Sequence, residues 1–323
     1  MRASRRALLA AGAGLVASRA GRAQAVWPGG RPIQVIVPFP PGGGTDVNIR
    51  AMLPHFERHL PGASFIVVNR PGAGGEIGYT AMADAAPDGY TIGTVITPSL
   101  QTITIERRPR YRLDDFVFLG TVVEDPSGFH VAPDSPFRSV ADIVAAARAE
   151  PGTIPVGTAG IGSDDHLLMI ALERAANIKL NHIPFAGQAP TVTALLGGHI
   201  RIASMNMGES MGLIRDGRVR AIASAGVTRF PLTPEVPTFR EAGYAIDTRV
   251  VRSLVVPAGT PEPIRARLSA MLAATMHDAA WIAEAVRLDI PLRWLDAEAT
   301  RALVHREAEA LRRLWADQPW RDQ

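Results

Sequence analysis

The chain reads Pro38-Phe39-Pro40-Pro41-Gly42-Gly43-Gly44-Thr45-Asp46 between an apolar run, Ile33–Val37, and an amphipathic stretch, 46–60. This order predicts a strand, a tight loop and a helix. Glycine permits positive φ and close approach of a ligand to the backbone, while Thr45 or Asp46 can cap the helix. Because free N–H groups at a helix start attract anions, the stretch predicts a carboxylate cradle. A tight turn with an ordinary Asp cap is the alternative.

Two further glycine loops join strands to helices. The first is Asn69-Arg70-Pro71-Gly72-Ala73-Gly74-Gly75, for which close packing of helix on sheet is an equal alternative. The second runs from Gly157 to His166 and contains Thr158, Gly162 and Ser163. Ser163 is a natural N-cap, and His166 either faces a ligand or is a polar residue that touches nothing. None of the loops has the Gly-Lys-Ser/Thr or G-x-G-x-x-G pattern of a nucleotide site.

Strand and helix patterns alternate along the chain, which predicts an α/β fold with parallel sheets. A second run of alternation begins after residue 134, so we expect one α/β unit inserted into another. The chain would cross between two lobes near 122–131 and return near 247–256, and two crossings suit a hinge. Pro54 lies inside the first helix pattern, where we expect a kink or a restart of the helix.

Opposed helix starts from the two lobes could grip both ends of a small anion. This arrangement requires backbone donors, and not acidic side chains, along the gap.

Composition excludes several classes of site. The 323 residues contain no cysteine and have a net charge of +3, with basic and acidic residues interleaved. We therefore expect no disulfide, no thiolate chemistry and no nucleic-acid partner. His55 and His59 have the i,i+4 spacing of metal ligands but no third ligand nearby, so we expect a solvated helix face, no metal and no cofactor. The paired carboxylates of the chain are adjacent in sequence, so on a regular element their side chains point apart and predict no acid–base dyad.

The N-terminus predicts export. A basic head at Arg2, Arg5 and Arg6 precedes an apolar stretch, 7–17, and Ala23-Gln24-Ala25 fits a small-x-small cleavage site. Residues 1–25 are therefore expected to be a signal peptide, of the twin-arginine (Tat) or the Sec type. This places the mature chain in the periplasm.

These motifs, taken in order, resemble the Bug-type solute receptors, the extracytoplasmic components of tripartite tricarboxylate transporters. The resemblance covers nearly the whole mature chain and rests on an ordered set of stretches: 31–43, 69–75, 86–91, 160–167, 184–187, 195–198, 237–243 and 257–261.

The resemblance implies a type II periplasmic-binding-protein fold, with lobe 1 at 26–124 and 251–323 and lobe 2 at 125–250. It implies a non-enzymatic receptor that captures a di- or tricarboxylate, an amino acid or an aromatic acid for membrane components of a transporter. A monomer is expected. An exported α/β enzyme such as a hydrolase, and a sensory receptor for a membrane signalling protein, are the alternatives. The expected ligand-binding residues are Phe39, Pro40, Gly43, Gly44, Thr45, Asp46, Thr97, Thr158, Gly162, Ser163, His166 and Asn206.

Some positions depart from the family pattern. Phe185-Ala186 stands where Tyr-Lys is common, and Arg201 stands where an acidic residue is usual. Methionine at 205 and 207 adds adaptable apolar lining beside Asn206. Together these positions indicate a solute less polar than citrate, such as an aromatic acid.

Overall fold

The computed structural model describes residues 27–317, 319 and 320, so the expected signal peptide at 1–25 lies outside the described residues. In this part of the chain, no helix combines the length and the apolar character that a membrane crossing requires.

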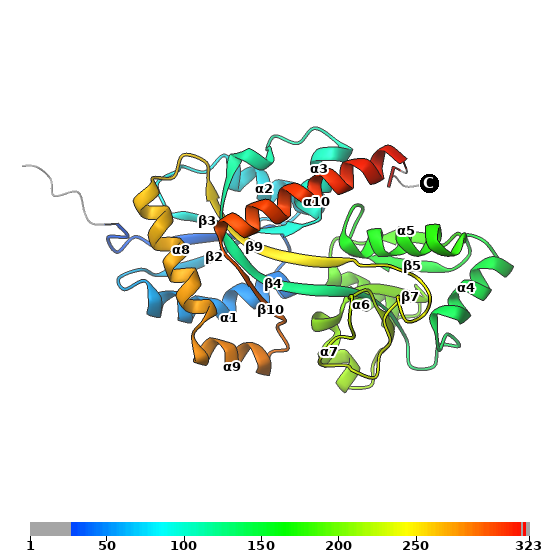
Figure 1. Ribbon diagram of the computed structural model, residues 1–323. Coiled ribbons are helices and arrows are strands. Elements are labelled where there is room, and N and C mark those ends of the chain that lie inside the picture. Colours follow the sequence, from blue (N-terminus) through cyan, green and yellow to red (C-terminus); the bar gives the residue numbers. More distant parts are fainter. Residues whose placement is uncertain (1–26, 318, 321–323) are drawn as a thin grey trace, which may run out of the picture.

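The first lobe is built on three parallel strands and the helices around them (Figure 1). Strand β1 lies between β2 and β3 and pairs with both in parallel. The elements of this lobe are β1 (Ile33–Val37), α1 (Gly44–His59), β2 (Phe65–Asn69), η1 (Ala73–Gly75), α2 (Glu76–Ala83), β3 (Thr91–Thr97), α3 (Ser99–Glu106), η2 (Leu113–Asp115), α8 (Glu262–Met276), α9 (Ala279–Arg287), β10 (Leu292–Leu295) and α10 (Ala297–Asp317).

The second lobe repeats the arrangement, with β5 between β6 and β7 and parallel to both. Its elements are α4 (Val140–Ala149), β5 (Pro155–Thr158), α5 (Asp164–Ala176), β6 (Asn181–Pro184), α6 (Gln188–Leu196), β7 (Ile202–Asn206), α7 (Met207–Arg215) and β8 (Arg220–Ser224).

Two long strands, β4 (Phe116–Val131) and β9 (Arg249–Pro257), run between the lobes (Figure 1). Residues 116–126 of β4 pair antiparallel with β9, and residues 127–131 pair with β7 and β8 of the second lobe. Within the described residues, strand pairing through β4 therefore connects ten strands, with β8 and β10 attached to β4 beside the main path, although each lobe has its own sheet and core. The lobe boundaries at 124/125 and 250/251 stay predictions, because both strands run unbroken across them.

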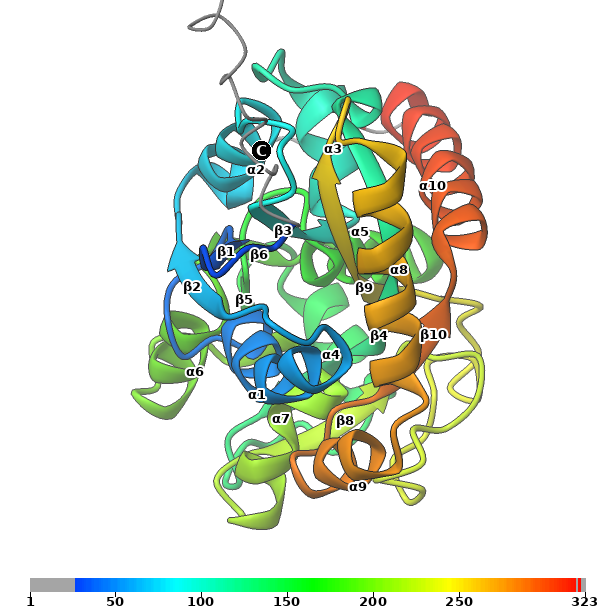
Figure 2. The same cartoon turned by 90° about the vertical axis from the view of Figure 1, so that its left-hand side faces the viewer.

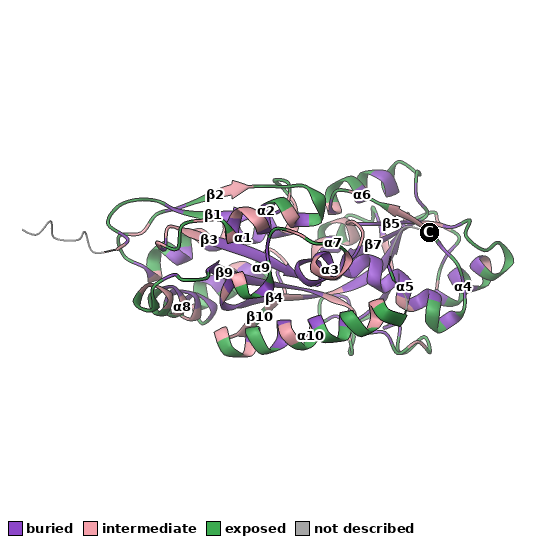
Figure 3. Cartoon of the chain, turned by 90° about the horizontal axis from the view of Figure 1, so that it is seen from above, coloured by how far each residue is buried: buried purple, intermediate pink, exposed green. Residues whose placement is uncertain are grey.

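Helices cover both faces of the first-lobe sheet. Alternate residues of β9 point to opposite faces: Leu254 packs with α1 and α8, while Val255 packs with α2, α3 and α10. Figure 2 looks onto this lobe from its outer end, and Figure 3 shows the buried strands between exposed helix surfaces. The C-terminal part of α10 then reaches the second lobe, where Leu311, together with Trp320 beyond the helix, packs against Leu167 and Ile170 of α5.

Strand β1 has the predicted bounds at both ends, and α1 begins two residues before the predicted stretch 46–60 and ends one residue before its end. Of the two expectations at Pro54, the restart is wrong, because α1 continues through that proline as one helix, and the kink stays a prediction. The expected solvated face is wrong for His55, which is 3% exposed. Its Nε2 lies 2.9 Å from Glu284 Oε2, and its ring packs edge-on against Trp281 of α9.

Candidate functional site

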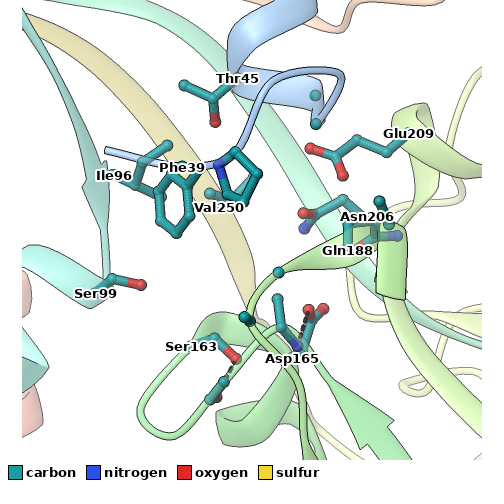
Figure 4. A pocket seen from close by; sticks show the side chains of 18 of the residues that line it. Phe39, Thr45, Ile96, Ser99, Ser163, Asp165, Gln188, Asn206, Glu209 and Val250 are labelled. Atoms are coloured by element: carbon teal, nitrogen blue, oxygen red, sulfur yellow. Dashed lines mark hydrogen bonds between the residues drawn. The ribbon is translucent and has the colours of Figure 1, made fainter. Parts of the chain in front are cut away.

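A small cavity lies between the two lobes, with a volume of about 90 Å³. Sites for drug-sized ligands span ~300–1,000 Å³, so this cavity suits only a small molecule. One side is apolar, and Phe39, Ile96 and Val250 gather there (Figure 4). The opposite side is polar and carries Gln188, Asn206 and Glu209.

The loop after β1 reaches this cavity through its glycines. Gly42 has a φ of 82°, and Gly43 is the N-cap of α1 without a side-chain hydrogen bond. Gly44 begins the helix, and a Cβ at this position would lie 2.0 Å from Oε1 of Glu209. The missing side chain at Gly44 therefore makes room for a carboxylate from the other lobe.

Asp46 turns back into its own loop and does not line the cavity. Its carboxylate accepts hydrogen bonds from Gly42 N (3.0 Å), Arg50 Nε (3.0 Å) and Asn69 Nδ2 (2.9 Å). Burial pushes the pKa of Asp46 up, but these hydrogen bonds outweigh it and the pKa is lowered overall. Asp46 thus fixes the loop between β1 and α1, and Asn69 ties the second glycine loop to it.

Most backbone N–H groups of the loop before α5 already donate hydrogen bonds to acceptors in the loop or in the first turn of α5. Ala159 N donates to Asp165 Oδ2, Gly160 N to Thr158 Oγ1, Gly162 N to His166 Nδ1, and Ser163 N to Gly160 O. Ser163 caps α5 as predicted, because its Oγ accepts from His166 N at 3.2 Å. The loop therefore has few backbone donors left for an anion.

Thr158 and His166 lie behind the wall, in a buried polar cluster. Thr158 Oγ1 lies 2.7 Å from Nε2 of His182, whose ring stacks on His166 with 3.8 Å between centroids. Burial, with His182 beside it, lowers the pKa of His166 to about 3, so this ring is neutral. The alternative in which His166 touches nothing is wrong. Gly162 joins the lobes instead, because its carbonyl accepts from Thr102 Oγ1 at 2.9 Å.

Charged side chains meet where the lobes approach each other. Arg252 of β9 forms an ion pair with Glu209 of α7, and both are largely buried. Asp164 Oδ2 accepts from Ser127 Oγ and from Asn206 Nδ2, both at 2.7 Å. Asn206 is thus held by an acid beside the cavity.

The expectation of a gap without acidic side chains is wrong. Asp164, Asp165 and Glu209 all line the cavity, and Arg252 is the one basic residue of its described lining. Burial raises the pKa of Asp164 and of Glu209. Burial also raises the pKa of Asp165 well above its usual range, and Asp164 raises it further. Two helix starts gripping an anion through backbone groups alone do not describe this site.

Comparison with known proteins identifies the family. Residues 52–314 match the model of the tripartite tricarboxylate transporter family receptor, TctC. The chain belongs to this family.

Relatives of this TctC receptor agree with that assignment. A protein encoded in the tcbD-tcbE intergenic region of Pseudomonas sp. strain P51 is 35% identical over 74% of this chain and 72% of its own length. The structure of the periplasmic binding protein BugD is 28% identical, with a TM-score of 0.83 over 91% of this chain and 99% of that one.

Two solved structures from Rhodopseudomonas palustris contain bound acids. MatC with malate is 26% identical, with a TM-score of 0.79 over 87% of this chain and 98% of that one. Rpa4515 with adipate is 26% identical, with a TM-score of 0.84 over 90% of this chain and 97% of that one. These matches confirm the periplasmic-binding-protein fold and the receptor class, and they rule against the exported enzyme kept as an alternative.

The structure brings some of the expected residues of this TctC receptor to the cavity and leaves others behind its wall. Those on the wall are Phe39, Pro40, Gly43, Gly44, Thr45, Ser163 and Asn206. Those outside its described lining are Asp46, Thr97, Thr158, Gly162 and His166.

The residues of this lining that sequence reasoning missed include Asp164, Asp165, Gln188, Glu209 and Arg252. A signal existed only for Arg252, which is the one charged residue in an apolar strand pattern, 250–256.

Proposed function

We propose that this TctC receptor works in the periplasm, where it captures a small carboxylated solute between its lobes and delivers it to the membrane components of a tripartite transporter. The malate and adipate bound to two similar proteins of known structure support a carboxylate. The basic head, apolar stretch and cleavage site of residues 1–25 support export.

The observation that carries the proposal is the cavity enclosed by both lobes, with donors from each. Thr45 and the start of α1 contribute from the first lobe, and Gln188 at the start of α6 contributes from the second. Nε2 of Gln188 is buried and has no hydrogen-bond partner among the described residues. A solute carboxylate beside it would supply an acceptor, which a buried N–H group needs.

Closure of the lobes would follow from binding. The solute contacts both sides of the cavity, so it binds the closed state better than the open one and shifts the population toward it. The proposed lobes are 26–124 with 251–323, and 125–250, and they would turn about β4 and β9. We expect one monomer to bind one solute.

The apolar side of the cavity supports a solute less polar than citrate. Phe39, Ile96 and Val250 offer it no hydrogen-bonding side chain. A thermal-shift screen tests this directly: acids with an apolar part should raise the melting temperature most, whereas stabilisation by citrate-like acids alone would refute it.

Titration calorimetry of the mature chain, beginning at Val26, tests the receptor function. We expect at least one small acid to bind with micromolar affinity, about −8 kcal/mol. Mass spectrometry after incubation should recover that acid unchanged. Failure of every mono-, di- and tricarboxylate to bind, or conversion of the acid to a product, would contradict the proposal.

A further inference from the structure

The wall of the cavity carries more negative than positive charge. Three acidic side chains, Asp164, Asp165 and Glu209, line it together with Arg252. Fully ionised, these four groups have a net charge of −2, and Arg252 is already paired with Glu209. A solute with two negative charges would meet repulsion, which the low dielectric of a buried site strengthens.

Asp165 is the acid on this wall whose hydrogen bonding is incomplete. It is 1% exposed, and its Oδ2 accepts from Ala159 N at 3.3 Å. Its Oδ1 is buried and has no hydrogen-bond partner among the described residues. Figure 4 shows Asp165 on the floor of the cavity, below Gln188 and Asn206. A hydrogen-bond donor on the solute would therefore give Asp165 Oδ1 the partner that it lacks. Buried carboxyl oxygens are rarely left without one.

A metal ion is a poor occupant for this place. Within the described residues, no group of three or more His, Cys, Asp or Glu side chains is arranged to hold one. A single open carboxyl oxygen suits an N–H donor better than a cation that requires several oxygen ligands.

We infer that the solute carries a protonated amine as well as a carboxylate, and that Asp165 receives the amine. This inference rests on the proposed function and narrows its solute class to amino acids and related amino-carboxylates. The carboxylate would lie beside Gln188 Nε2, and the apolar remainder would pack on Phe39 and Ile96. A solute with one amine and one carboxylate adds no net charge to this wall, on which Asp164 and Glu209 outnumber Arg252 even when Asp165 is protonated.

Proton release gives the inference a distinct signature. Burial and the nearby acids Asp164, Glu209 and Asp125 favour the protonated form of Asp165 in the free receptor. An ammonium group next to Oδ1 favours the ionised form, so binding should expel a proton into solution. A carboxylate without an amine would release no proton, because Asp165 would stay protonated and donate a hydrogen bond to it.

Matched solute pairs make the test. Aspartate is compared with succinate, and leucine with 4-methylpentanoate, since each pair differs by one amine. We expect at least one aminated member to bind at least tenfold more tightly than its partner. Asp165→Asn should remove most of that preference, while Asp134→Asn, at an exposed position of the second lobe, should leave it unchanged.

Calorimetry of the wild type in Hepes and in Tris counts the protons and does not depend on any variant folding. Release of protons with the aminated solute is the expected result. Equal affinities within both pairs, binding of the aminated solute without proton release, or an unchanged preference in Asp165→Asn would overturn the inference and leave the receptor function standing. Failure of every acid in the wider panel would instead contradict the proposed function itself.

Discussion

Removing Arg252 should destabilise the receptor strongly, because its guanidinium is the cation among several buried acids. The side chain is 3% exposed and is paired with Glu209. It also lowers the pKa of Asp125 and of Asp164, both of which burial raises. Arg252→Met keeps most of the volume of the side chain but leaves these carboxyl groups without a counter-charge.

The magnitude follows from the burial of the pair. Breaking a buried ion pair by removing one partner costs about 3–5 kcal/mol, whereas replacing both partners is often close to neutral. We therefore expect Arg252→Met to lose about 3–5 kcal/mol of unfolding free energy at pH 7.5. The double variant Arg252→Met/Glu209→Gln should recover a large part of that loss.

Urea unfolding followed by circular dichroism measures these free energies. The loss in Arg252→Met should shrink at pH 5, because carboxyl groups that have lost their cation are then protonated. A loss below about 1 kcal/mol, the range of a solvent-exposed pair, would refute the reasoning. So would a double variant whose loss equals the sum of the two single losses, because the residues would then not be coupled.

Three further predictions concern single side chains. Ser163→Ala should lower the free energy of unfolding by about 1 kcal/mol, because the N-cap of α5 is lost. It should also weaken solute binding measured by calorimetry. An unchanged affinity would show that this loop does not contribute to the binding site. Phe39→Ala should lower affinity for an apolar acid roughly tenfold by removing buried contact area, and an equal loss for every acid would contradict the assigned role. Burial raises the pKa of Asp125 to about 7, so the wild type should lose stability as pH rises from 4 to 7 because the unfolded carboxyl ionises first. Asp125→Asn should flatten that dependence in urea titrations, and an unchanged slope would show that another group causes it.

Local sequence signals predicted the elements and the loops. Glycines at 42 and 162 have positive φ, as tight turns require, and Ser163 caps the helix that follows it. Such signals act within a few residues, which is why element bounds could be read from the chain alone. The length of β4 could not, because its register depends on pairing with β9 more than a hundred residues away.

The chemistry of the cavity was less predictable, because it depends on pairs distant in sequence. Glu209 and Arg252 meet only after α7 and β9 are placed on opposite sides of the cavity. Asp164 and Asp165 are adjacent, and sequence reasoning gave them no role. Both are buried at the start of α5 and line the cavity. No local pattern distinguishes such acids from solvated ones, since burial is a property of the whole fold.

A crystal structure of the receptor with an aminated acid tests the central claim most directly. We predict one solute between the lobes, with its carboxylate next to Gln188 and the start of α1, its amine on Asp165 Oδ1, and its covalent structure intact. A solute bound outside this cavity, or a chemically altered one within it, would contradict the account.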